Sequence, residues 1–131
     1  ILSNIMMALD TDLLEGSSEK VAALKIRLEA LDKTALRLLT RFDEGQEIGA
    51  EPSMLKLKGS QLVQDMDRVL YEVAGYYGMP LDSVMRGDTP VGPDYADMVA
   101  SGMFHHRGFT IAGGTSEIQR NIIARQVLGL S

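Results

Sequence analysis

A pair of glycines before a predicted helix is the part of the sequence best suited to bind a ligand. Gly113 and Gly114 allow the backbone to approach a ligand closely or to adopt a positive φ, and Thr115 or Ser116 can cap the helix that follows. Ser116 and Gln119 also have the spacing of a capping box. Free N–H groups and the helix dipole at such a position favour an anion such as a phosphate. On this pattern alone, a ligand site and an ordinary capped helix both remain open.

The residues around this pair resemble a known signature. The segment from Gly113 to Ala124 is similar to the C-terminal signature of acyl-CoA dehydrogenases, in which a Gly-Thr pair and an Ile-Gln-Arg sequence begin the last long helix. Residues 127–130, Val-Leu-Gly-Leu, continue it in the style of many bacterial members, and residues 54–59, Met-Leu-Lys-Leu-Lys-Gly, resemble the start of a bundle helix in several of them. The resemblance implies the C-terminal helical domain of a bacterial-type enzyme, spanning residues 1–131.

The resemblance also implies an activity. Members of the family use FAD to oxidise an acyl-CoA to a trans-2-enoyl-CoA, and an electron-transfer flavoprotein reoxidises the flavin. In most members an N-terminal helical domain and a β-barrel domain precede the helical one, and the resemblance implies that these 131 residues correspond to the third domain alone. We therefore expect the chain to supply part of an FAD site and of a homo- or hetero-oligomer interface, in a dimer or tetramer. The isolated piece is expected to be inactive.

The position of the catalytic base departs from the family pattern. The catalytic glutamate usually precedes the Gly-Thr pair directly, and Gly113 occupies that position here. Glycine accepts no proton, so no catalytic residue is predicted. The base could come from an earlier helix, or the chain could be the base-less partner subunit of a heteromeric enzyme or a relative with different chemistry. Glu117 lies in the first turn of the helix, where the dipole stabilises a carboxylate, and we interpret it as a cap or a flavin contact.

The family places flavin and substrate contacts in two segments. The implied cofactor-binding residues are Gly113, Gly114, Thr115, Glu117, Glu72 and Gly75. The last two fall roughly where a neighbouring subunit contacts the adenosine end of FAD. Ala112 and Gly113 fall at the acyl pocket, and a small residue at position 112 predicts room for a bulky or branched acyl group.

The rest of the sequence predicts helices that position this site. Apolar residues recur every three or four positions over residues 21–42, 55–73 and 118–127, which is typical of amphipathic helices. Pro52 suits the first turn of the second helix, Pro93 a shorter one, and Gly129 a helix end. A further helix is expected over residues 1–14, and because it has no clear start, the chain is expected to be a piece of a longer protein. No segment alternates with period two, so the fold class is all-α, an up-and-down four-helix bundle.

Composition narrows the function classes. The net charge is −5 without a basic stripe, which disfavours nucleic acid as a partner. No run approaches the roughly 20 apolar residues of a membrane-spanning helix. The absence of cysteine excludes disulfides and is consistent with the bacterial cytoplasm. A non-catalytic helical assembly module is the alternative function.

Several groups that could do chemistry have simpler interpretations. His105 and His106 are adjacent and are interpreted as packing or rim residues. The Asp65–Asp67 and Asp94–Asp97 pairs are interpreted as solvated faces. Gly59 lies on an apolar stripe, which suggests a close approach between helices or a position that weakens its own helix.

Overall fold

The computed structural model describes residues 18–81, 87, 89 and 91–130. All regular structure within these residues is helical, which confirms the all-α fold class. The α-helices are α2 (Ser18–Asp43), α3 (Glu51–Ala74), α4 (Val99–Arg107) and α5 (Ser116–Leu128), and the 3-10 turns are η2 (Gly75–Gly78), η4 (Asp94–Ala96) and η5 (Gly108–Thr110). The helix expected over residues 1–14 lies outside the described residues. None of the described helices is both long and apolar enough to cross a membrane.

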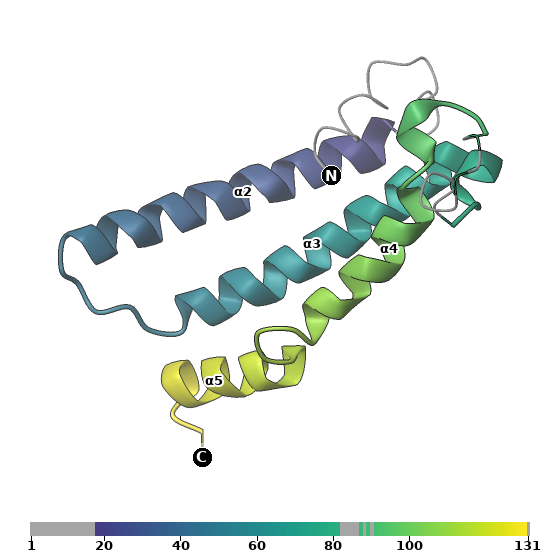
Figure 1. The fold of residues 1–131 in the computed structure, drawn as a ribbon. Coiled ribbons are helices and arrows are strands. Elements are labelled where there is room, and N and C mark those ends of the chain that lie inside the picture. The colour runs from purple at the N-terminus through teal and green to yellow at the C-terminus, as the bar shows by residue number, and fades with distance from the viewer. Residues whose placement is uncertain (1–17, 82–86, 88, 90, 131) are drawn as a thin grey trace.

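Helix α3 is the centre of the arrangement. It runs antiparallel to α2, and α4 and α5 follow one another along its other side (Figure 1). The short α4 lies against the second half of α3, while α5 lies against the first half. As a result, the segment that joins α4 to α5 meets α3 near its middle.

Ion pairs at heptad spacing fix the register of α2 on α3. Pairs join Lys20 to Glu72, Arg27 to Asp65, and Arg41 to Glu51, in each case from α2 to α3. The α2 members lie at multiples of seven residues, so they fall on one face of the helix. At the remaining position of this heptad series, Thr34 of α2 lies opposite Lys58 of α3, and these two side chains cannot form an ion pair. A cavity of about 340 Å³ lies there, lined by Arg27, Ala30, Leu31, Thr34, Met54, Lys58 and Leu62.

The ion pair between Arg41 and Glu51 also stabilises the loop that joins α2 to α3. The Arg41 guanidinium donates to Glu51 Oε1 (2.7 Å), to Gln46 Oε1 (3.2 Å) and to the Glu47 carbonyl (3.2 Å). A hydrogen bond from its own backbone N–H, followed by the contact with Arg41, lowers the pKa of Glu51 below 4.5. Pro52 stands in the first turn of α3, as the sequence predicts.

The apolar stripe of α2 is only partly covered. Val21 and Leu24 are buried, but Phe42, at the other end of the stripe, is 66 % exposed. The ion-pair register explains this result. It pairs Arg41 with Glu51, the first residue of α3, and therefore carries Phe42 past the end of its partner helix.

The buried core lies around the second half of α3. It comprises Leu24, Leu62, Met66, Leu70, Ala74, Tyr95, Ala96 and Val99. Pro93 precedes η4, as a helix-opening proline should, but the short helix expected there is divided. A 3-10 turn brings Tyr95 and Ala96 into the core, and the α-helix that follows continues to Arg107.

The prediction that Asp65 and Asp67 form one solvated face is wrong. Asp65 pairs with Arg27 and Arg68, whereas Asp67 is only 4 % exposed and lies 3.0 Å from Nδ1 of His106. Residues two apart on a helix point to nearly opposite sides. Asp65 therefore faces α2, and Asp67 faces α4.

Gly59 does mark a close approach between α2 and α3. A Cβ built on Gly59 would lie 3.6 Å from Cδ2 of Leu31, an ordinary van der Waals distance. The two helices are therefore close here, but an alanine would also fit.

Candidate functional site

The connection between α4 and α5 is a tight turn that requires glycine. The amides of Ile111 and Ala112 both donate to the Gly108 carbonyl and close its first half. Gly113 and Gly114 then adopt φ values of +68° and +94°, which side-chain-bearing residues rarely adopt. The positive φ expected for the glycine pair is therefore present.

Thr115 is the N-cap of α5. Its backbone is extended and its hydroxyl accepts from the Ile118 amide (3.3 Å). Ser116 is the first helical residue and is buried, and its hydroxyl donates to the Thr110 carbonyl (3.5 Å). The capping box proposed from Ser116 and Gln119 is absent, because the cap lies one residue earlier than that spacing assumes.

Gln119 instead binds the glycine turn. Its side-chain amide donates to the carbonyls of Gly113 (3.1 Å) and Gly114 (3.5 Å). Lys56 reaches the same place from α3, and its ammonium group donates to the Gly114 carbonyl (2.5 Å). The turn is thus fixed by side chains from two helices.

The carboxylate of Glu117 lies at the start of α5. Its pKa is lowered, first by a hydrogen bond from its own backbone N–H, next by the Thr115 hydroxyl, and then by the charges of Arg120 and Lys56. A carboxyl group with a lowered pKa is a weaker proton acceptor near neutral pH. This environment supports interpreting Glu117 as a first-turn residue and disfavours a role as the base.

The outer side of the turn is open. Ala112 and Gly113 are both exposed, and a Cβ on Gly113 would meet no atom within 4 Å among the described residues. A ligand can therefore approach the backbone here. Three cavities among the described residues lie elsewhere. Two of them, of about 340 Å³ and 190 Å³, lie between α2 and α3, and one of about 480 Å³ is lined by residues of α3 and α5 with Gly49 and Ala50. An acyl pocket at Ala112 stays a prediction.

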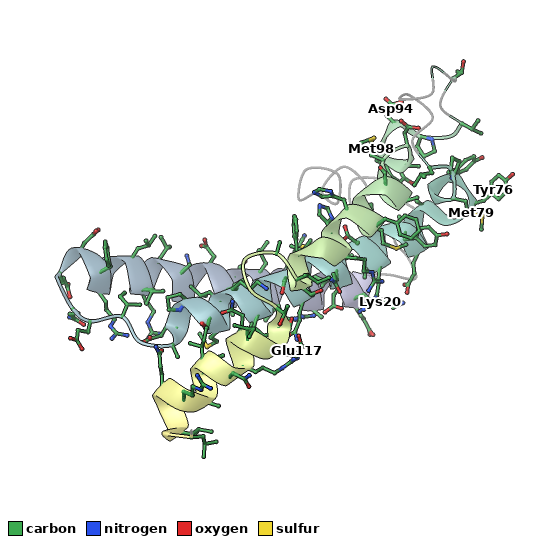
Figure 2. All side chains as sticks on the ribbon, turned by 60° about the horizontal axis from the view of Figure 1, so that its bottom comes forward. Lys20, Tyr76, Met79, Asp94, Met98 and Glu117 are labelled. Atoms are coloured by element: carbon green, nitrogen blue, oxygen red, sulfur yellow. The ribbon has the colours of Figure 1, made fainter. Side chains whose placement is uncertain are left out.

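The other two predicted cofactor residues lie far from this turn. Glu72 is exposed and pairs with Lys20, and Gly75 ends α3 with a φ of +52°. At the helical rise of 1.5 Å per residue, Glu72 is about 24 Å along α3 from Lys56. Figure 2 shows Glu117 well apart from Tyr76 and Met79, which follow Gly75. Within one chain the two sets of residues do not meet.

Sequence reasoning missed the side chains that hold the turn. Gln119 was noticed for its capping-box spacing and as part of the Ile-Gln-Arg signature, and Lys56 only as a member of the segment 54–59. The pair of His106 with Asp67 was missed completely, because the sequence contains no local sign of a contact between α3 and α4. His106 also packs against the Phe109 ring at a centroid distance of 4.9 Å, which agrees with a packing role.

Comparison with known proteins gives one match. The sequence model of the family described as acyl-CoA dehydrogenase, C-terminal domain, matches residues 14–128. No match was found among curated proteins or among solved structures. The matched range contains α2 to α5 and therefore the whole glycine turn.

Proposed function

Because the chain belongs to the acyl-CoA dehydrogenase family as a C-terminal domain, we propose that it forms part of an FAD-dependent acyl-CoA dehydrogenase. Its contribution is one wall of the flavin and thioester site, together with much of an oligomer interface. FAD, when bound, would supply the hydride acceptor for oxidation of the α,β carbon–carbon bond. Electron-transfer flavoprotein is the proposed acceptor of the electrons.

The observation that carries this proposal is the open glycine turn at the N-terminus of α5. Among the described residues, Gly113 leaves free space where a side chain would stand, and Thr115 caps the helix that follows. Such a backbone fits a flat or anionic ligand that must approach closely, because side chains are absent and the helix N-terminus favours negative charge. Gly113, Gly114, Thr115 and Glu117 are the residues proposed to contact FAD.

Two further observations support an oligomer. Glu72 and Gly75, the other proposed FAD contacts, lie at the end of α3 remote from the turn, and we assign them to an FAD molecule bound by a neighbouring subunit. Large apolar side chains are also exposed on α2 and beyond the end of α3, notably Ile26, Leu36, Leu39, Phe42, Tyr76, Met79, Leu81 and Met98. Exposed apolar residues in such number are typical of protein interfaces.

A second function has a specific observation in its favour. Gly113 has no side chain to accept a proton, and the lowered pKa of Glu117 makes it a poor replacement. These facts favour a base-less partner subunit of a heteromeric dehydrogenase, or a helical assembly module. In both cases the chain would assemble with other subunits and leave proton abstraction to them.

A visible absorption spectrum of the gel-filtered protein, with intact-mass analysis of the same fraction, tests the proposal. Flavin bands together with a larger mass or a second chain would support it, and the second chain should then contain the base. Enoyl-CoA formation measured with an artificial electron acceptor is expected to be absent for the 131 residues alone. A colourless assembly with partner subunits that bind no flavin would favour the assembly module.

A further inference from the structure

The carbonyl groups of Gly113 and Gly114 both accept hydrogen bonds from side chains of neighbouring helices. The Gly113 carbonyl accepts from Gln119, and the Gly114 carbonyl accepts from Lys56 and from Gln119. Gln119 is 7 % exposed and belongs to α5, while Lys56 is half-buried on α3. The turn is therefore tied to both helices at once.

The geometry of the peptide bond gives the directions of the Gly114 and Thr115 N–H groups once the directions of the preceding carbonyls are known. The described residues contain no cis peptide bond, and in a planar trans peptide the C=O and the following N–H point to opposite sides. Because the Gly113 carbonyl points to Gln119, the Gly114 amide points away from it. By the same reasoning, the Thr115 amide points away from Lys56.

We propose that Lys56 and Gln119 are positioning residues, which hold the two carbonyls inward so that the Gly114 and Thr115 amides face an oxygen acceptor on the ligand. This inference rests on the proposed function for the identity of the ligand, but the positioning itself is a property of the chain alone. Neither side chain touches the ligand, and each acts through the backbone of the turn.

The charge of Lys56 suits this role. A hydrogen bond from an ammonium group is stronger than one between neutral groups, so it can hold a carbonyl against a ligand that competes for the backbone. Lys58 supplies the contrast. It points away from Lys56 on the same helix and lines the cavity between α2 and α3. Two lysines of one short segment therefore have separate roles.

NMR relaxation of the backbone amides in the full chain tests the proposal. In the native chain, the amides of Gly113 to Ser116 should have order parameters near 0.85, the value of a rigid backbone. Lys56→Met keeps the aliphatic stem and removes the donor, and it should lower these values toward about 0.6, the level of a flexible segment. Lys56→Arg should restore them, because the guanidinium also donates, whereas the matched variant Lys58→Met should leave them unchanged.

Unchanged order parameters in both Lys56→Met and Gln119→Leu would overturn the proposal, as would an equal fall in Lys58→Met. A failure of Lys56→Arg to restore rigidity would also count against it. None of these measurements needs a ligand, so they remain distinct from a failure of the proposed function. That failure would appear instead as no binding of FAD by the assembled native protein.

Discussion

The two halves of α3 are held by different kinds of contact. In the second half, Met66, Leu70 and Ala74 are buried in one apolar cluster with residues of η4 and α4. In the first half, the buried residues are Ser53, Ser60 and Leu62, the last of which stands at the boundary of the two halves, and most other contacts are polar. Cavities lie beside this half, between it and α2 and between it and α5.

This difference separates stability from function. The apolar half supplies most of the burial that favours the folded chain, whereas the polar half orients the glycine turn through Lys56. Segments that bind ligands are commonly drawn from the less stable parts of a protein. The proposed site therefore lies where α3 is loosely packed, and the core lies where no ligand contact is proposed, apart from Glu72 and Gly75 at its outer end.

Truncation of matching methionines gives the largest expected difference between the halves. Met66→Ala should lower the free energy of unfolding by about 2–5 kcal/mol, because it leaves a cavity in the core. Met66 is 5 % exposed, whereas Met54 in the first half is 37 % exposed, and Met54→Ala should cost less than about 1 kcal/mol. Urea denaturation monitored by circular dichroism would measure both. Equal costs would refute the comparison.

The buried pair between α3 and α4 should be almost as sensitive. His106→Ala would leave the Asp67 carboxylate, now 3.0 Å from Nδ1 of His106, buried without that partner. The expected loss is about 2–3 kcal/mol, the penalty for desolvating an unpaired polar or charged group. The double change His106→Phe with Asp67→Leu should recover most of the loss in the same denaturation assay. A neutral His106→Ala variant would show that the pair contributes little.

Substitution in the glycine turn should be costly at one position more than at the other. Gly114→Ala combines a φ of +94° with a Cβ placed 2.8 Å from Nε2 of Gln119, and we expect a loss of about 2 kcal/mol. Gly113→Ala has open space around the Cβ and a φ of +68°, within the left-handed region, so about 1 kcal/mol is expected. Thermal denaturation of both variants would rank them, and the reverse order would contradict the geometry described for the turn.

The loosely packed half should also accept added contacts. Gly59→Ala should raise the free energy of unfolding by roughly 0.5–1 kcal/mol, because alanine favours the helix and the new Cβ would touch Leu31 at 3.6 Å. Denaturant unfolding would detect this gain. A loss of stability would mean that α2 and α3 are packed more tightly here than the comparison of the two halves assumes.

The smallest expected effect concerns the position between α2 and α3 where Thr34 faces Lys58 without an ion pair. Thr34→Glu would place a carboxylate opposite Lys58, at the same register as the pair of Arg27 with Asp65. Exposed ion pairs contribute little, so a gain of no more than about 0.5 kcal/mol is expected, decreasing with added salt. Thr34→Gln is the uncharged control. A gain of equal size in the control would assign the effect to packing and not to charge.

The sequence predicted the helices themselves better than the contacts between them. The place of Pro52 in the first turn of α3 and the end of α5 at Gly129 follow from local backbone preferences, and both are confirmed. The family assignment is also confirmed, because a continuous segment of similar residues carries that information. The division of the short helix after Pro93 was missed, since its turn brings Tyr95 and Ala96 into a core formed mainly by other helices.

For the candidate site, the sequence identified the backbone but not what holds it. The glycine pair, the threonine cap and the first-turn glutamate could all be named from their order in the chain. Lys56 and Gln119 could not be assigned to the turn, because a lysine on a helix surface has no preferred partner until another element packs beside it. The wrong interpretation of Asp67 has the same origin, since burial depends on which helix covers that face.

The sequence by itself determined that the chain is helical, where its helices end, and which segment could present free backbone to a ligand. These properties depend on residues close together in the chain, through backbone conformation, helix capping and the period of apolar side chains. Only the tertiary structure decided that α4 and α5 share one side of α3, that His106 lies against Asp67, and that Lys56 donates a hydrogen bond to the turn. Those contacts join residues from different helices, and they form only after burial of the apolar faces has fixed how the helices pack.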